Sequence, residues 1–182
     1  MIRRPPRSTP KPSSAASDVY KRQIYGELIG YGATSDAYHM TRASDDAEGI
    51  VEAIKLALQD ANVDAEEIDH INAHGTSTQL NDKIETLAFK KVFGSRAYNI
   101  PITATKSVTG HSIGGAGGIE AVASVLTIEN EFIPPTINYE TPDPDCDLNY
   151  VPNKGINVKV NFVLSNSVGF GSRNATIIIK KF

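Results

Sequence analysis

Hydrophobic and polar positions alternate along most of the chain with the periods of helices and strands. Apolar residues recur every three or four positions in three stretches, which predicts helices over residues 46–61, 80–93 and 114–129. Shorter apolar runs predict strands at residues 24–31, 70–73, 100–105, 157–167 and 175–180. This alternating order predicts an α/β fold: a mixed, mostly parallel sheet with helices on both faces and a terminal β-hairpin.

The ends of the first two helices carry recognisable signals. Ser44 or Asp45 is expected to cap the first helix, Asn62 lies near its end, and Gly94 ends the second. The second helix is expected to turn its apolar residues toward the core, namely Leu80, Ile84, Leu87, Ala88 and Val92.

Residues 1–23 differ in composition from the rest. They are basic, rich in proline and serine, and almost free of apolar residues. They lack the apolar centre of a secretory signal and resemble translated vector or adapter sequence. We expect this segment to be non-native and disordered, and residues 24–182 to form the folded domain, starting in the middle of a larger gene product.

Composition narrows the class of protein. Apolar residues make up 40% of the chain and charged residues 21%, as in ordinary globular domains. A net charge of −3 gives no electrostatic surface for nucleic acid or a membrane, and no apolar run is long enough to cross a bilayer. The single cysteine excludes an internal disulfide and fits a reducing cytoplasm.

The candidate chemistry lies where two short predicted strands end. His74 follows the strand at residues 70–73 and precedes Gly-Thr-Ser-Thr, a small and polar stretch. Lys106 and His111 follow the next strand, inside a loop with five glycines. Loops at the carboxyl ends of strands are where α/β proteins place their chemistry. Lys106 is either a solvated loop lysine or a buried cation that holds a polar network.

A metal site and a nucleotide site are both disfavoured. His70 and His74 have the spacing of helical zinc ligands, but Ile71 stands where zinc proteases have glutamate. The segment also reads as a strand, which would hold the two rings apart. His70 is therefore expected at the surface, where its strand begins. The glycine loop lacks both the Gly-Lys-Ser/Thr ending of a P-loop and the spacing of a dinucleotide fingerprint.

Cys146 is the one candidate thiol nucleophile. It lies between Asp145 and Asp147, and nearby negative charge raises a thiol's pKa. We interpret it as a structural residue.

Several long motifs resemble one known family. NAHGTST, TKSVTGHSIGGAGGIEA and SNSVGFGSRNA resemble the carboxyl-terminal motifs of the β-ketoacyl-acyl-carrier-protein synthases, above all the type II condensing enzymes. GYGATSDAYHMT and PPTINYETPDPDCDLNYVP fit the same family, so the resemblance covers residues 24–182.

The resemblance implies the carboxyl-terminal half of a thiolase-like fold, which has two similar halves and usually pairs into a homodimer. It also implies elongation of acyl chains by decarboxylative Claisen condensation in fatty acid biosynthesis. Acyl and malonyl thioesters would arrive on acyl carrier protein. No separate cofactor is expected, because the phosphopantetheine arm comes with the carrier.

The resemblance assigns roles to residues of the matching motifs. His74 and His111 would donate hydrogen bonds to the malonyl thioester oxygen as negative charge develops there. Lys106 would lie behind them, paired with Glu120 of the following helix.

Three further residues would contact the acyl substrate or its carrier arm. Thr76 and Thr78 would face the phosphopantetheine, and Phe170 would gate the acyl pocket while its backbone N–H helps to form an oxyanion hole.

The chain departs from the family pattern in two respects. The family's nucleophilic cysteine belongs to the amino-terminal half, so this chain has no nucleophile and is expected to be inactive alone. Ser172 and Arg173 stand in GFGSRN where the family commonly has GFGGTN or GFGGHN. Arg173 either points to solvent or alters the pocket entrance.

Four alternatives stay open. A polyketide ketosynthase shares these motifs, and a thiolase proper would replace one histidine with another cysteine. A non-catalytic chain-length partner subunit typically loses catalytic residues, whereas His74, His111 and Lys106 are all present. The fourth is a fragment without a stable fold, since half of a two-half core leaves apolar surface exposed.

Overall fold

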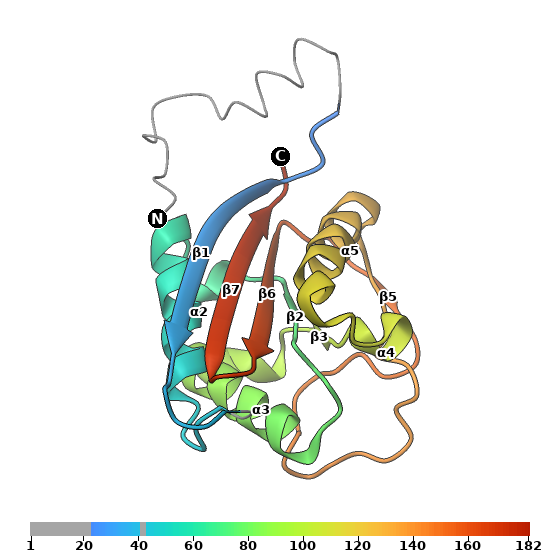
Figure 1. Ribbon diagram of the computed structural model, residues 1–182. Helices are drawn as coiled ribbons and strands as arrows, with labels where there is room; N and C mark the ends of the chain where they lie inside the picture. The colour runs from blue at the N-terminus through green and yellow to red at the C-terminus, as the bar shows by residue number, and fades with distance from the viewer. Residues whose placement is uncertain (1–22, 41–42) are drawn as a thin grey trace.

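A computed structural model of the chain describes residues 23–40 and 43–182 (Figure 1). The expectation of disorder over residues 1–23 lies outside the described residues, apart from Gln23, which belongs to no helix or strand.

A five-stranded sheet in the order β1-β7-β6-β2-β3 organises the fold. Its strands are β1 (Glu27–Ser35), β2 (His70–Asn72), β3 (Ile102–Thr103), β6 (Phe162–Gly169) and β7 (Arg173–Lys180). β2 runs parallel to β3 and β6, whereas β7 is antiparallel to both β6 and β1. The sheet is mixed and ends in a hairpin, as predicted. The longest strand pairs, β1 with β7 and β6 with β7, are antiparallel. The sheet is therefore less parallel than predicted, because β1 pairs with the outer strand of the hairpin rather than with a parallel neighbour.

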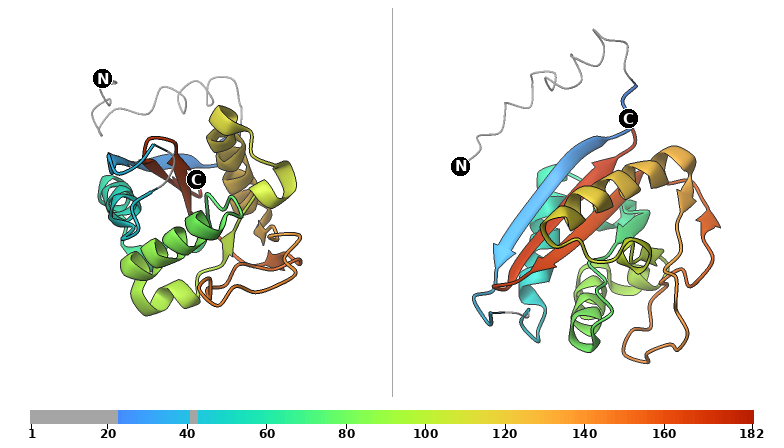
Figure 2. Two further views of the ribbon diagram at one scale, coloured as in Figure 1. Left: turned by 60° about the horizontal axis from the view of Figure 1, so that its bottom comes forward. Right: turned by 45° about the vertical axis from the view of Figure 1, so that its right-hand side comes forward.

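Helices cover both faces of this sheet, as predicted. α2 (Glu48–Ala61) and α3 (Gln79–Phe93) lie on one face, and α5 (Ala116–Asn130) lies on the other (Figure 2). Each face of the sheet has its own hydrophobic core, and successive residues of β6 point into one and then the other. Leu164 packs with α2 and α3, and Val163 packs with α5. This is the two-residue period of a strand that is buried on both faces.

Glycines in β1 let α2 lie directly on the strand. A Cβ atom on Gly32 would overlap the carbonyl oxygen of Ala53, and one on Gly30 would overlap that of Ala57. Residues without side chains are therefore required where the backbones of strand and helix approach this closely.

Strand boundaries differ from those predicted. The first strand runs over Glu27–Ser35 rather than residues 24–31, and the hairpin begins at Phe162 rather than at residue 157. Ile156–Asn157 instead forms β5, which pairs with β4 (Phe132–Ile133) in a separate two-stranded ladder. A short helix, α4 (Lys106–Thr109), occupies the start of the predicted glycine loop.

The predicted amino-terminal cap of α2 is wrong, whereas the predicted ends of α2 and α3 are confirmed. The capping position of α2 is Ala47, and the Asp46 carboxylate accepts the N–H of Glu48 at 3.1 Å. Asn62 and Gly94 end α2 and α3 with φ of 55° each, a conformation that glycine and asparagine tolerate.

The buried face of α3 is rotated from the predicted one. Leu80 and Leu87 are both more than one-third exposed, while Glu85 and Thr86 are buried. The rotation directs Glu85 at the loop after β2, where backbone N–H groups need an acceptor. No helix in the described part of the chain is long and apolar enough to span a bilayer.

Candidate active site

Two parallel strands bring the histidines and the lysine to one edge of the sheet. β2 ends at Asn72 and leads directly to His74. Its parallel neighbour β3 ends at Thr103 and leads into α4, whose first residue is Lys106. α4 ends at Thr109, and Gly110 follows with φ of 71°, so that His111 turns back toward His74. The two imidazole rings meet edge to face, with centroids 5.4 Å apart and planes at 83°.

His74 is held in its neutral form. Its side chain is buried, and burial lowers its pKa to about 3, helped by the charges of Lys106 and His111. Its Nδ1 is buried without a hydrogen-bond partner among the described residues. An imidazole in this state can donate a hydrogen bond at neutral pH without carrying a charge.

His111 is exposed, and a backbone contact fixes its tautomer. Its Nδ1 accepts the N–H of Ile113 at 3.2 Å. Since Nδ1 is an acceptor, the proton of the neutral ring lies on Nε2. Nε2–H is thus available as a donor.

Lys106 and Glu120 form a buried ion pair near the histidines. Both side chains are almost inaccessible, and the Lys106 ammonium contacts a Glu120 carboxylate oxygen. The other carboxylate oxygen lies 3.4 Å from the Ser167 hydroxyl. Burial raises the pKa of Glu120, while the hydrogen bond from Lys106 works against that rise. Lys106 is therefore the buried cation of the two alternatives set out above.

Glu85 is a site residue that sequence reasoning missed. Its carboxylate accepts the backbone N–H groups of His74 and Gly75 at 2.9 and 2.8 Å. The amides of Asn166 and Asn81 add bonds of 2.8 and 2.9 Å. Burial raises the pKa of Glu85, and these four bonds oppose that rise by favouring the carboxylate. Glu85 thus fixes the backbone at His74 and Gly75, and with it the position of the His74 side chain.

A cavity of about 630 Å³ opens beside these groups. Lys106 and His111 line it, as do Ala73 and Gly75 on either side of His74, whereas His74 is not among the lining residues. Thr76 and Thr78 also line it, and their hydroxyl oxygens are 3.2 Å apart.

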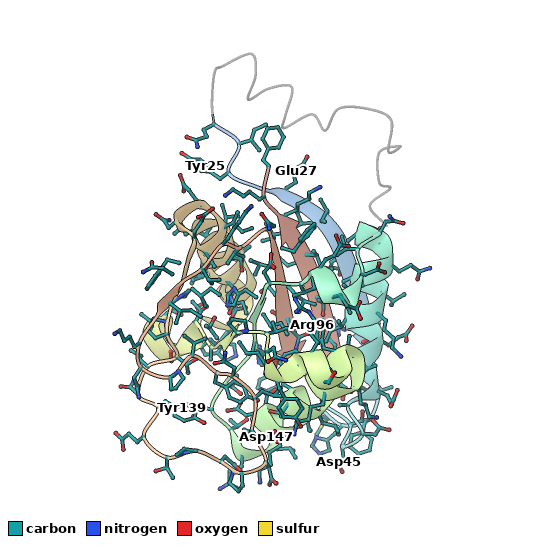
Figure 3. All side chains as sticks on the ribbon, turned by 180° about the vertical axis from the view of Figure 1, so that it is seen from behind. Tyr25, Glu27, Asp45, Arg96, Tyr139 and Asp147 are labelled. Atoms are coloured by element: carbon teal, nitrogen blue, oxygen red, sulfur yellow. The ribbon has the colours of Figure 1, made fainter. Side chains whose placement is uncertain are left out.

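The loop between β4 and β5 forms another part of the cavity wall, and Tyr139 and Asp147 mark its course (Figure 3). Tyr139 and Cys146 of this loop line the cavity. Burial raises the pKa of the Cys146 thiol, and the charges of Asp143 and Asp82 add to the effect. The direction agrees with the sequence prediction, but burial is the larger cause.

Phe170 lies in the turn between β6 and β7 with 80% of its surface exposed, and it is not among the residues that line the cavity. Arg173, at the start of β7, is exposed and points to solvent, while Ser172 is buried.

The expectation that His70 lies at the surface is wrong. Its side chain is 1% exposed, because β2 is an interior strand with helices over both faces. Its Nε2 lies 2.8 Å from the Thr103 hydroxyl, and burial lowers its pKa to about 3. Within residues 23–40 and 43–182, no three histidine, cysteine, aspartate or glutamate side chains gather as metal ligands would.

The mixed sheet with helices on both faces, which has paired imidazoles at one edge and a buried ion pair beside them, has the thiolase-like fold. Residues 25–140 match the family described as Beta-ketoacyl synthase, C-terminal domain, and the chain belongs to that family.

Curated relatives agree with this assignment. The chain is 52% identical over 160 residues to 3-oxoacyl-[acyl-carrier-protein] synthase 2 of Synechocystis, and 49% identical over 158 residues to the protein of that name from Coxiella burnetii. These matches cover 88% and 87% of this chain but 38% of each relative, so the chain spans well under half of their length.

Solved structures show the same fold. A type II polyketide ketosynthase, in complex with its acyl carrier protein and bound to a hexaketide, has a TM-score of 0.89 and 41% identity. A β-ketoacyl synthase from Burkholderia phymatum has a TM-score of 0.85 and 34% identity. Each comparison covers 92% of this chain, and 41% and 40% of the respective structures.

Proposed function

We propose that this chain supplies the decarboxylating part of a 3-oxoacyl-[acyl-carrier-protein] synthase that elongates acyl chains in fatty acid biosynthesis. The observation that carries the proposal is the edge-to-face contact of His74 with His111, with the buried Lys106–Glu120 pair nearby. Hydrogen-bond donors on two adjacent imidazole rings suit an oxygen that becomes negative during the reaction.

In the proposed reaction a malonyl thioester loses CO2, and its electrons pass to the carbonyl oxygen as an enolate. His74 and His111 stabilise that oxygen by hydrogen bonding, each contributing about 3 kcal/mol to the transition state. The enolate carbon then attacks an acyl thioester, and the thiolate of the acylated cysteine leaves. Lys106 and Glu120 act on the histidines through their fixed charges and do not contact the substrate.

The substrate's approach is proposed from the cavity. Thr76 and Thr78 line it and would bond a phosphopantetheine arm brought by acyl carrier protein. The polyketide ketosynthase relative, seen with its own acyl carrier protein, supports such a partner. We further propose a homodimer for the full-length protein and a cytoplasmic location, which the single cysteine suits.

The acylated cysteine is not supplied by this chain in our proposal. Cys146 is disfavoured because burial raises its pKa and suppresses the thiolate. We therefore expect the isolated chain to give no net elongation when it is mixed with acyl- and malonyl-carrier protein. Formation of an elongated product would refute this part of the proposal.

The site itself is testable in a chimera. Residues 24–182 would replace the matching region of the Synechocystis relative, and elongation would be measured by mass spectrometry of the carrier protein. His74→Ala or His111→Ala should lower the rate about 100-fold or more. Lys55→Ala, on the exposed side of α2, is the control and should leave the rate unchanged. Full activity of either histidine variant would refute the proposed roles.

A polyketide ketosynthase is the second candidate, favoured by the structural match to the hexaketide-bound enzyme. The curated 3-oxoacyl-[acyl-carrier-protein] synthases are more similar in sequence, at up to 52% against 41% identity. A non-catalytic partner subunit is disfavoured because His74, His111 and Lys106 are all present and gathered at one site.

A further inference from the structure

Ser172 occupies a position that would suit glycine. It lies in the turn between β6 and β7 with φ of 53°, in the left-handed region that side chains usually avoid. It is nevertheless fully buried. A serine retained in this conformation needs contacts that offset the strain.

The Ser172 hydroxyl makes such contacts with a segment far away in sequence. It donates to the carbonyl oxygen of His39 at 2.8 Å and accepts the N–H of the same residue at 3.1 Å. The backbone of the turn adds two more bonds. The Ser172 carbonyl accepts the N–H of Asp36 at 2.9 Å, and the Gly171 N–H donates to Met40 at 2.7 Å.

The turn carries Phe170, whose side chain is 80% exposed. Because little packing holds this ring, its position depends on the backbone of the turn. We propose that the Ser172 hydroxyl is a positioning group that holds the 170–172 turn against residues 39–40 and so restricts where Phe170 can lie.

A separate contact holds the same segment to β7. The Asn174 amide donates to the Asp36 carboxylate at 2.6 Å, and that carboxylate also accepts the N–H of Ser44 at 3.1 Å. Removal of the Ser172 hydroxyl should therefore loosen the turn while the segment stays anchored at Asp36. The consequence for an acyl substrate near Phe170 rests on the proposed function, whereas the behaviour of the turn does not.

The test follows the turn directly in the full chain. The protein has no tryptophan, so Phe170→Trp introduces a single tryptophan at the tip of the turn, which can be excited apart from the seven tyrosines. Ser172→Gly removes the hydroxyl and also relieves the positive φ. In this background it should lower the fluorescence anisotropy of the tryptophan. It should also make the His39 amide exchange at least about fivefold faster, because one of its hydrogen bonds is lost.

Ser95→Ala, at an exposed serine away from the turn, is the matched control and should change neither readout. Ser172→Ala keeps the Cβ atom and should behave as Ser172→Gly does. The proposal is overturned if both Ser172 variants leave the tryptophan anisotropy and the His39 exchange rate unchanged. It is also overturned if Ser172→Ala leaves them unchanged while Ser172→Gly alters them. Faster exchange throughout β6 and β7 would also overturn it, since the hydroxyl would then stabilise the whole sheet rather than position the turn.

Discussion

Replacement of His70 should change how the stability of the protein depends on pH. His70 is buried and its pKa is about 3, against 6.5 for a free histidine. Below about pH 6.5 the unfolded chain takes up a proton on this residue that the folded chain does not. Stability is therefore lost as the pH falls, at about 1.4 kcal/mol per pH unit, until the pH approaches the folded pKa.

The expected loss from His70 alone is about 2 kcal/mol at about pH 5, relative to neutral pH. His74 adds a loss of the same sign because its pKa is also about 3. Asp82, Glu85 and Glu120 act in the opposite direction, since burial raises their pKa values and the folded state binds protons more tightly there. The pH dependence of the wild-type free energy of unfolding therefore contains several opposing contributions. The contribution of His70 is obtained by comparison with a variant that lacks this histidine.

His70→Gln is the suitable variant. Its amide can reach the Thr103 hydroxyl that His70 contacts at 2.8 Å, and it does not titrate. Urea unfolding followed by far-UV circular dichroism, between about pH 7.5 and pH 4.5, gives the free energy of unfolding of both proteins. The wild type should lose about 1.4 kcal/mol more per pH unit than the variant below about pH 6.5. Parallel curves for the two proteins would refute the claim that His70 is buried and uncharged.

Five further single substitutions test the site and the fold. Glu120→Gln and Lys106→Met should each lower the free energy of unfolding by about 3–5 kcal/mol, because each leaves a buried polar group without its partner. The double variant should lose less than the sum, and additive losses would contradict a coupled pair. Glu85→Gln should cost about 1–3 kcal/mol and speed amide exchange at His74, because a backbone donor then faces an amide donor; unchanged exchange would count against this role. Gly32→Ala should cost about 1–3 kcal/mol by forcing α2 from β1. Gly118→Ala, an open position in α5, should stabilise slightly by helix propensity, and equal effects of the two glycine changes would argue against the close approach.

The sequence predicted those helices and helix ends that depend on residues close to one another in the chain. The period of apolar residues located α2, and the conformational preferences of Asn62 and Gly94 located two helix ends. The sheet order depends on contacts between distant residues. β1 pairs with β7, so Glu27 lies opposite Lys180, and no local pattern specifies such a pairing.

The site was predictable from the sequence only in part. His74, Lys106 and His111 were noticed because each follows a short apolar run and lies among small residues. Glu85 was missed because its role depends on the rotation of α3, which turns a carboxylate rather than Leu87 toward the core. His70 was misplaced because a polar residue at a strand entrance looks exposed until the covering helices are known.

The strand order has a consequence for the order of folding during synthesis. β1 is the first strand of the sheet to leave the ribosome, yet the neighbour it needs, β7, is the last of the five to be made. Until then the backbone groups of β1 that pair with β7 lack their strand partner, while its apolar side chains need shielding from other nascent chains. Completion of this sheet is therefore a late event, for which β1 must be kept apart from competing strand edges.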